Sequence, residues 1–446
     1  TKRRMKHAGD FDDVIAFAWD GPMGAVAQSA RLLLLDSLGC MIAGLGHAVP
    51  RRFAEALAMT MPGALHLPRC AVGVSEAGAA AVLASAMCWD EANEGLARAH
   101  GRPALAVAPL CIAALAAGRV SPRAAHDAFA LGYEIAARAG EIWRIRPGMH
   151  VDGSWHSLGA AAAAARLAGG NAAEVARAIR LASCQIPFAL YAPIAAGMDG
   201  RNSYPAHAVL LGAMAAAAAR AGMDAPAEGL AEARRIALLH QTPALRAPAG
   251  EWLIAEAYIK PFAGVRHAHY AAAAALELRA AIADRLDDIT AIRLETYGEA
   301  LRYAANRAPM RAIQAQFSLS WAVAAALMQG DLGPGAYTDG ALIDPELRRL
   351  EALVELTEDT ALTRAEKRGA RLIVTLADGE SHAASVGAIA GDPGLALDTA
   401  AVAAKCQRFA APVIGDAAMA RLTELMLGLG EGVPREFFGA SMGAPL

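Results

Sequence analysis

The spacing of hydrophobic positions predicts helices along the first half of the chain. Apolar residues recur with helical periodicity at 12–60, 76–99, 104–118, 121–141, 157–168, 172–186 and 204–221. The breaks between these stretches carry residues that stop or start helices, such as Gly118, Ser121-Pro122 and Gly169-Gly170-Asn171. A looser stretch follows up to about residue 250. This part of the chain is therefore predicted to be a bundle of helices.

A period of two replaces the helical period further along. Residues 289–297 alternate between apolar and polar side chains, and so do residues 371–376, which run into a hairpin-type turn at Asp378-Gly379. A further helix is predicted between the two segments, at 314–329. Residues 259–397 are therefore expected to form an α+β unit with an antiparallel sheet.

Helical periodicity returns near the C-terminus, at 398–430. The economical interpretation is that one domain is inserted into another. We expect residues 1–258 and 398–446 to form a discontinuous, all-helical bundle domain, and residues 259–397 to form a smaller α+β lid domain. The predicted fold class is thus mainly α.

Composition favours close helix packing and limits the partners. Alanine runs stand at 160–165 and 215–219, and alanine both favours helix and lets helices approach closely. The net charge is −3 and there is no basic tail, which argues against nucleic acid. The uncharged stretch 181–198 contains Pro187 and Pro193, so a buried helix and turn are favoured over a membrane span. The basic N-terminus precedes an acidic segment, so no secretory signal is expected.

Cysteine usage and motifs point to a protein without metal or nucleotide. The six cysteines are spread out and form no Cys-x-x-Cys pair, as is typical of a reduced, cytoplasmic protein. The sequence has no Gly-x-Gly-x-x-Gly, Walker A or His-Glu-x-x-His pattern. His267 and His269 would diverge on a helix, so they make a poor metal pair.

The densest cationic segment runs from Lys260 to His269 and also contains Arg266. Pro261 and Gly264 make its first half an irregular turn. Such a segment can hold carboxylates, because arginine offers a bidentate fork, lysine a point charge and a helix N-terminus its dipole. The alternative is a solvated basic turn.

Several motifs occur in an order and spacing that cover nearly the whole chain. They are Leu35-Asp36-Ser37-Leu38-Gly39, Gly132-Tyr133-Glu134, Gly148-Met149-His150, Lys260-Pro261-Phe262 with His269, Ala315-Gln316-Phe317-Ser318, and Gly391-Asp392-Pro393. In these motifs the chain resembles the MmgE/PrpD family, which includes 2-methylcitrate dehydratase, cis-aconitate decarboxylase and iminodisuccinate epimerase. The resemblance implies a helical bundle interrupted by a smaller α+β lid, and a homodimer without a cofactor.

The resemblance also implies site residues. His150 stands where the family keeps a catalytic histidine, and Lys260 and His269 stand where it keeps a lysine and a histidine of the cleft. Arg201 replaces a second cleft lysine, and Tyr204 a nearby histidine. The same aligned segment contains a further candidate, His207.

Two other segments depart from the family pattern. The family histidine of a His-Pro-Ser segment corresponds either to His100, after a two-residue insertion, or to Arg102; both alternatives stay open. The family's Asp-Phe-Asp-Asp-Thr segment becomes Cys88-Trp89-Asp90-Glu91-Ala92. A presumed catalytic aspartate is thus replaced by Cys88, and the threonine by alanine.

Chemistry at a polycarboxylate needs cations that bind carboxylates and a group that moves a proton beside one of them. His150 has a suitable ordinary pKa for proton transfer. Lys260, Arg201, His269 and Arg266 would neutralise carboxylates and an enolate-like intermediate. The proton work of the missing acid could fall to Asp90 or Glu91 on a repositioned turn. It could also fall to Cys88, because cations depress thiol pKa values; the alternative for Cys88 is a buried filler.

The sequence therefore predicts a cofactor-free lyase, of the dehydratase or decarboxylase type, that acts on a small di- or tricarboxylate. Two alternatives stay open. An epimerase would need proton removal and return but no leaving group, which suits a site that has lost an acid. A catalytically silent family member would only bind a ligand or dimerise.

Overall fold

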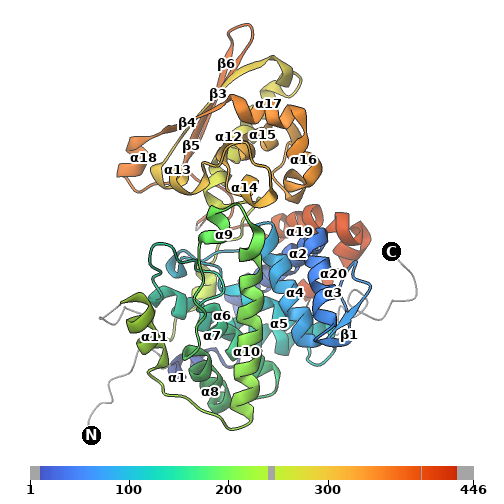
Figure 1. The fold of residues 1–446 in the computed structure, drawn as a ribbon, viewed down its shortest axis with the longest axis vertical. Helices are drawn as coiled ribbons and strands as arrows, with labels where there is room; N and C mark the ends of the chain where they lie inside the picture. Colours follow the sequence, from blue (N-terminus) through green and yellow to red (C-terminus); the bar gives the residue numbers. More distant parts are fainter. Residues whose placement is uncertain (1–10, 240–246, 393, 429–446) are drawn as a thin grey trace.

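The computed structural model describes residues 11–239, 247–392 and 394–428. Figure 1 shows a helical part that contains the first half of the chain, and above it a smaller part in which helices accompany a sheet. The mainly α fold class with a smaller α+β part is thereby confirmed. The division into two domains at 259 and 397 stays a prediction.

Most of the predicted helices are found in the helical part, but the stretch predicted at 76–99 is an α-helix only as far as Trp89. Its helices are α1 (Asp12–Ala18), α2 (Gly24–Leu45), α3 (Ala48–Ala58), α4 (Glu76–Trp89), α5 (Ala108–Ala116), α6 (Pro122–Ile142), α7 (His156–Leu167), α8 (Ala172–Ser183), α9 (Ala192–Ala195), α10 (Tyr204–Arg220) and α11 (Gly229–Leu238). Short 3-10 turns join them: η1 (Ala97–Ala99), η2 (Pro103–Ala106), η3 (Asp199–Ser203) and η4 (Leu253–Glu256). Between α3 and α4 lies a small antiparallel pair, β1 (Pro62–His66) and β2 (Gly73–Val74).

Small residues set the close packing of this part. Gly132 on α6 and Gly159 on α7 face each other, and a Cβ atom on either would meet the other's backbone oxygen at less than 3.0 Å. Helix α7 packs between α6 and α10, and α4 packs against α10. Alanine and glycine thus allow the short interhelical distances that the composition predicts.

The α+β part is built around one four-stranded sheet. Its elements are α12 (Arg266–Ile282), η5 (Leu286–Asp288), β3 (Ile289–Thr296), α13 (Gly298–Ala304), α14 (Ala312–Gln316), α15 (Leu319–Gln329), η6 (Pro334–Tyr337), α16 (Asp339–Ile343), α17 (Pro345–Leu353), β4 (Val354–Glu358), α18 (Thr360–Arg364), β5 (Ala370–Leu376) and β6 (Ser381–Val386). The strand order is β4-β3-β5-β6. Buried side chains on β3 and β5, such as Leu294 and Val374, point to the helix-covered face.

The sheet differs from the expectation in one respect. Strands β3, β5 and β6 pair antiparallel, but β4 pairs with β3 in parallel. The expected antiparallel sheet is therefore found in β3, β5 and β6, and β4 adds a parallel strand at one edge. The alternation in β4 is only five residues long and follows α17 directly, so a period of two is hard to see there.

The chain returns to the helical part through α19 (Thr399–Ile414) and α20 (Asp416–Gly428). Helix α19 packs along α2, and the Lys405 ammonium on α19 donates to Asp36 Oδ1 at 2.5 Å and to the Ala92 carbonyl at 2.7 Å. Among the described helices, α2 alone is long and apolar enough to cross a membrane, and 72% of its most apolar window is buried inside the molecule. It is therefore a mostly buried helix of the bundle. The cytoplasmic location stays a prediction.

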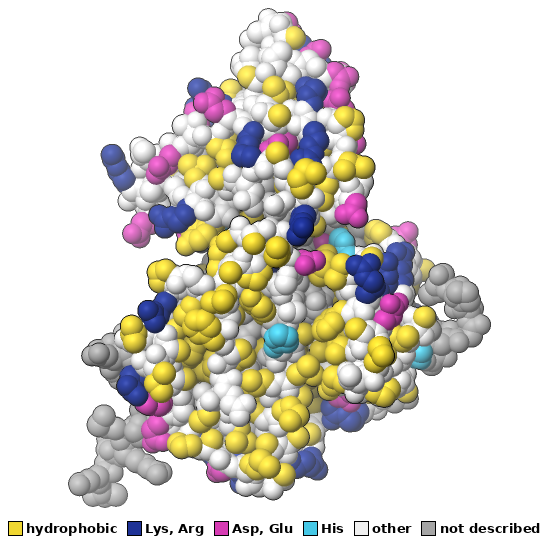
Figure 2. Space-filling model, viewed as in Figure 1, with side chains coloured by type: hydrophobic (Ala, Val, Ile, Leu, Met, Phe, Trp, Pro, Cys, Tyr) yellow, Lys and Arg dark blue, Asp and Glu magenta, His cyan; other side chains and the backbone are white. Residues whose placement is uncertain are grey.

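An open apolar groove lies beside α9. Its volume is about 730 Å³, and it is lined by Phe188, Leu190, Ala192, Pro193, Ala196, Met198, Asp199, Gly200, Tyr204 and Arg311. Figure 2 shows the hydrophobic side chains that gather on this face of the molecule, over α9 and α10. Because Arg311 belongs to the α+β part, the groove runs where the two parts meet.

Candidate active site

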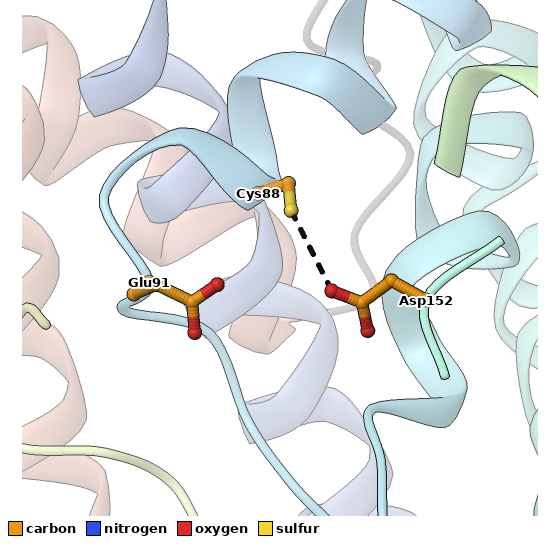
Figure 3. A group of neighbouring side chains, drawn as sticks. All are labelled: Cys88, Glu91 and Asp152. Carbon is orange, nitrogen blue, oxygen red and sulfur yellow. Dashed lines mark hydrogen bonds between the residues drawn. The ribbon is translucent and has the colours of Figure 1, made fainter. Parts of the chain in front are cut away.

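Buried charged side chains from five separate segments meet near the end of α4. Glu91 follows α4, Arg102 precedes η2, Asp152 lies in the loop before α7, Arg201 lies in η3, and Lys260 begins the turn before α12. Figure 3 shows Cys88, at the end of α4, with Glu91 and Asp152 around the same space. We call Cys88 and these five charged residues the charged cluster. All six side chains are buried.

The backbone after α4 decides which acid enters the charged cluster. Glu91 adopts a left-handed conformation, with φ of 52°, which turns its side chain towards the cations. The preceding Asp90 points elsewhere, and its Oδ1 is 2.7 Å from His47 Nε2. Asp90, expected as a catalytic acid, therefore pairs with a histidine outside the charged cluster.

Arg201 and Lys260 reach the cluster from distant segments. The Arg201 Nη1 atom donates to Glu91, to Asp152 Oδ2 at 3.0 Å and to the Cys88 sulfur at 3.2 Å. Lys260 Nζ donates to the Glu91 carbonyl at 2.6 Å and lies 3.4 Å from Glu91 Oε2. Tertiary structure thus joins residues that are 110 and 169 positions apart.

Arg102 completes the cationic side. Its Nη2 atom donates to Asp152 and lies 3.3 Å from the Cys88 sulfur, and its Nη1 donates to Asn93 Oδ1 at 2.8 Å. His100, the alternative to Arg102, is exposed and has a left-handed backbone with φ of 49°. Of the two alternatives, the structure brings Arg102 into the charged cluster.

Three cations face two carboxylates in the charged cluster, which leaves one positive charge in excess. Burial alone would raise the Glu91 pKa, but Arg102, Arg201 and Lys260 together lower it to about 2. Burial lowers the Lys260 pKa to about 8, because Glu91 compensates only in part and Arg102 repels the ammonium. Glu91 is therefore ionised at neutral pH. Lys260 can release its proton at a pH only slightly above neutral.

Cys88 is a protonated thiol. Burial raises its pKa, and this effect outweighs the opposite influence of Arg201 and Arg102. The sulfur lies 4.0 Å from Asp152 Oδ2, to which the thiol donates (Figure 3). Of the two alternatives for Cys88, the thiol with a depressed pKa is therefore wrong, because full burial penalises the thiolate. The buried filler agrees with the burial of this side chain.

His150 lies at the edge of the charged cluster, where 11% of its side chain is accessible. Its Nδ1 accepts a hydrogen bond from the Asp152 backbone N–H at 3.0 Å and lies 4.0 Å from Asp152 Oδ2. The ring stacks on Tyr191 at 5.9 Å and meets Tyr204 edge-on at 6.1 Å. Burial lowers the His150 pKa to about 4. The neighbouring charges have smaller effects, since the carboxylates raise this pKa and the arginines lower it. The imidazole is thus neutral at pH 7.

Two of the cations expected in the site, His269 and Arg266, do not belong to the charged cluster. His269 is buried beside the Lys260 turn and its Nε2 lies 3.1 Å from the Gly264 carbonyl; burial depresses its pKa well below the ordinary value. It is therefore uncharged and does not supply the expected cation. Arg266 pairs with Asp392 and not with the charged cluster.

Of the two remaining candidates, Tyr204 lines the groove beside α9 and His207 lies on the surface. The Tyr204 hydroxyl donates to the Leu190 carbonyl at 3.1 Å, so Tyr204 lines the groove and contacts His150 at the same time. His207 is exposed on α10, and nothing in its surroundings joins it to the charged cluster.

Sequence reasoning missed Asp152. It stands two residues after His150, in a loop whose Gly153 has φ of 83°, and no spacing rule marks such a position. The available signal was its closeness to a candidate catalytic histidine. The sequence predicts Glu91 only as an alternative to Asp90. The structure gives the charged cluster two carboxylates where the sequence suggested that one had been lost.

The charged cluster suits an anion better than a metal ion. The sulfur of Cys88 and carboxylate oxygens of Glu91 and Asp152 lie within 4.8 Å of one another, as the ligands of a cation would. However, the guanidinium groups of Arg102 and Arg201 already donate to these atoms, and a cation there would meet their charge. In addition, Arg201 Nε and Nη2 are buried with no hydrogen-bond partner among the described residues.

Comparison with known proteins covers both parts of the chain. The family model described as MmgE/PrpD N-terminal domain matches residues 14–241, and the model described as MmgE/PrpD C-terminal domain matches residues 262–429. No curated protein matches the chain significantly.

Proposed function

The chain belongs to the MmgE/PrpD family, a family of dehydratase-type enzymes, and we propose that it is a lyase that acts on a small di- or tricarboxylate. The reaction would begin with removal of a proton from the carbon next to a substrate carboxylate. Support for this proposal comes from the donors, the charge and the proton-moving groups of the charged cluster.

The observation that carries the proposal is the unused edge of Arg201. The Nη1 atom of this guanidinium donates to Glu91 and Asp152, whereas Nε and Nη2 are buried without a partner among the described residues. A buried donor without a partner costs about 1–3 kcal/mol. The Nε and Nη2 hydrogens point in parallel, so together they fit the two oxygens of one carboxylate. A bound substrate carboxylate would satisfy both donors.

The excess positive charge supports the same substrate class. One substrate carboxylate on Arg201 would neutralise the surplus positive charge of the cluster. Because the side chains are buried, this attraction acts in a low effective dielectric and is stronger than on the surface. The surplus charge therefore suits one substrate carboxylate, and the further carboxylates of the proposed substrate are inferred from the family.

Proton transfer can use groups that are already present. In the proposed reaction, Asp152 or Glu91 accepts the proton from the substrate carbon, and the electron pair moves onto the substrate carboxylate beside the cations. The pair then returns to form a double bond while hydroxide leaves the neighbouring carbon. Lys260, whose pKa is about 8, donates the proton that turns this hydroxide into water. A decarboxylase would instead break the bond between a substrate carbon and its carboxylate and release carbon dioxide, and a proton would then be donated to the substrate carbon that keeps the electron pair.

The epimerase alternative is weaker than the sequence suggested. It was attractive because the family aspartate is replaced by Cys88, so one acid seemed to be missing. Asp152 supplies a carboxylate next to that sulfur, which removes the reason to prefer an epimerase. A silent family member is left as an outcome of the experiment.

The experiment has a binding stage and a chemical stage. A panel of di- and tricarboxylates is first screened by thermal shift, since a ligand at 100 times its dissociation constant stabilises the folded state by about 2.7 kcal/mol. Hits are then incubated in deuterated buffer and analysed by NMR and mass spectrometry, with Arg201→Lys as the matched variant.

Loss of water, or loss of carbon dioxide with deuterium incorporated into the product, is the expected result. Deuterium without a change in composition would indicate an epimerase. Binding without any exchange or change in composition would indicate a silent family member and would overturn the proposal.

A further inference from the structure

The position of the proton on His150 is decided by its neighbour. The Nδ1 atom accepts a hydrogen bond from the backbone N–H of Asp152, with the two nitrogens 3.0 Å apart. A backbone amide nitrogen can donate but not accept, so Nδ1 must carry a lone pair. A neutral imidazole has one N–H, and here that proton must reside on Nε2.

The ring is also held in place. Its backbone N–H donates to the Ala189 carbonyl at 2.9 Å. Tyr191 stacks on one face with an interplanar angle of 18°, and Tyr204 meets the ring edge-on at 64°. Tyr204 is itself fixed by its hydrogen bond to the Leu190 carbonyl. Turning the ring to expose Nδ1 would break the Asp152 contact and disturb both aromatic contacts.

We propose that His150 acts as a neutral hydrogen-bond donor through Nε2 and not as the base that removes the substrate proton. This inference rests on the proposed function. A neutral ring with Nδ1 occupied has no lone pair to offer the substrate, whereas its Nε2–H can meet an oxygen on which negative charge develops. Neutral imidazoles serve in this way in other enzymes.

The proton balance follows from this role. The substrate proton goes to Asp152 or Glu91, and the electron pair of the carbon–hydrogen bond moves to the substrate carboxylate. The Nε2–H bond of His150 stays intact and donates to the oxygen that gains charge. The low pKa of His150, about 4, keeps the ring neutral and thus preserves the amide contact at Nδ1.

Three substitutions separate a donor from a base. The side-chain amide of His150→Gln lies near the position of Nε2 and can donate, the amide of His150→Asn lies near Nδ1, and His150→Ala removes both. Loss of one donor to a developing oxyanion lowers kcat about 100- to 1,000-fold, which is expected for His150→Ala and His150→Asn. His150→Gln should stay within about tenfold of the wild type, with KM little changed. Equal loss in His150→Gln and His150→Ala would overturn the proposal.

A second measurement does not depend on turnover. Imidazole nitrogen chemical shifts of protein labelled with 15N-histidine, assigned to His150 by comparison with His150→Gln, report the tautomer at neutral pH. His382→Gln, in the α+β part, is the control for assignment. A protonated Nε2 with a bare Nδ1 is expected; a protonated Nδ1 would overturn the inference. Absence of exchange and of any change in composition with every polycarboxylate would instead contradict the proposed function, and the tautomer would still show whether His150 can act as a base.

Discussion

Replacement of Lys260 by methionine should make the protein more stable at neutral pH while it abolishes carboxylate binding. The Lys260 ammonium is fully buried, and its pKa falls from 10.5 to about 8, mainly because of burial. A lowered pKa in a lysine means that its charged form is less stable in the folded than in the unfolded chain. Methionine fills a similar volume without a charge. Glu91 would keep Arg102 and Arg201 as partners, so no acid is left alone.

The magnitude follows from the difference of about 2.5 pH units between the two pKa values. At 1.36 kcal/mol per unit, the charged lysine destabilises the folded state by roughly 3 kcal/mol at pH 7. The substitution also removes the hydrogen bond to the Glu91 carbonyl, which offsets about 1 kcal/mol. The free energy of unfolding of Lys260→Met is therefore expected to exceed that of the wild type by about 2 kcal/mol at pH 7.

The sign of the pH dependence is a stricter test than the gain itself. Below pH 8 Lys260 is protonated in both the folded and the unfolded wild type, so burial of its charge destabilises the folded state to the full extent. Between pH 8 and 10.5 the folded state releases the proton first, so wild-type stability rises towards that of Lys260→Met. The advantage of the variant should therefore shrink across this range.

Urea unfolding, followed by tryptophan fluorescence at pH 7 and pH 10, measures this difference. Two controls use the same substitution elsewhere. Lys367→Met, at an exposed position, should change little at either pH. Lys405→Met should instead destabilise by about 3–5 kcal/mol, because it leaves buried Asp36 without its cation. A Lys260→Met protein that is less stable than the wild type at pH 7, by an amount that does not vary with pH, would refute the reasoning.

Four further predictions concern other groups. Cys88→Ala should keep turnover within about threefold, since the buried thiol is protonated; steady-state kinetics that show complete loss would make the thiol catalytic. Asp90→Asn should leave turnover unchanged but lower stability by about 1 kcal/mol. Because Asp90 raises the His47 pKa against the effect of burial, the loss should be largest below pH 6.5 and fade as pH rises through the folded-state pKa, as urea unfolding over pH 5 to 8 would show. Arg201→Lys should raise KM for a polycarboxylate about 100-fold, because the bidentate contact is lost; an unchanged KM would remove Arg201 from the binding site. Light scattering should give twice the chain mass of 46.0 kDa for the expected homodimer, and Phe188→Asp, on the exposed apolar face, should give a monomer if that face forms the interface.

The helices and the main strands could be predicted from the sequence because their signals are local. A helix such as α6 or α8 buries one face, so its apolar residues recur at helical spacing whatever the rest of the chain does. The same holds for the alternation in β3 and β5. The short parallel strand β4 was not predicted, because five residues are too few to show a clear alternation of apolar and polar side chains. The order of motifs along the chain indicated the family, which both family models confirm.

The composition of the charged cluster was decided by tertiary structure. The sequence suggested Asp90 and left His100 and Arg102 as alternatives, whereas the fold turns Glu91 inwards and joins Arg102 to Asp152 across 50 positions. Which acid faces a cation depends on one left-handed residue and on how distant segments pack, and neither leaves a periodic signal.

The charge states were decided in the same way. The sequence predicts His269 and Lys260 as cations and leaves Cys88 as either an activated thiol or a buried filler. Burial makes His269 neutral, keeps Cys88 protonated and lowers the Lys260 pKa to about 8. A residue type fixes only the ordinary pKa, whereas the cost of a charge depends on the water and the partners that the folded chain leaves around it.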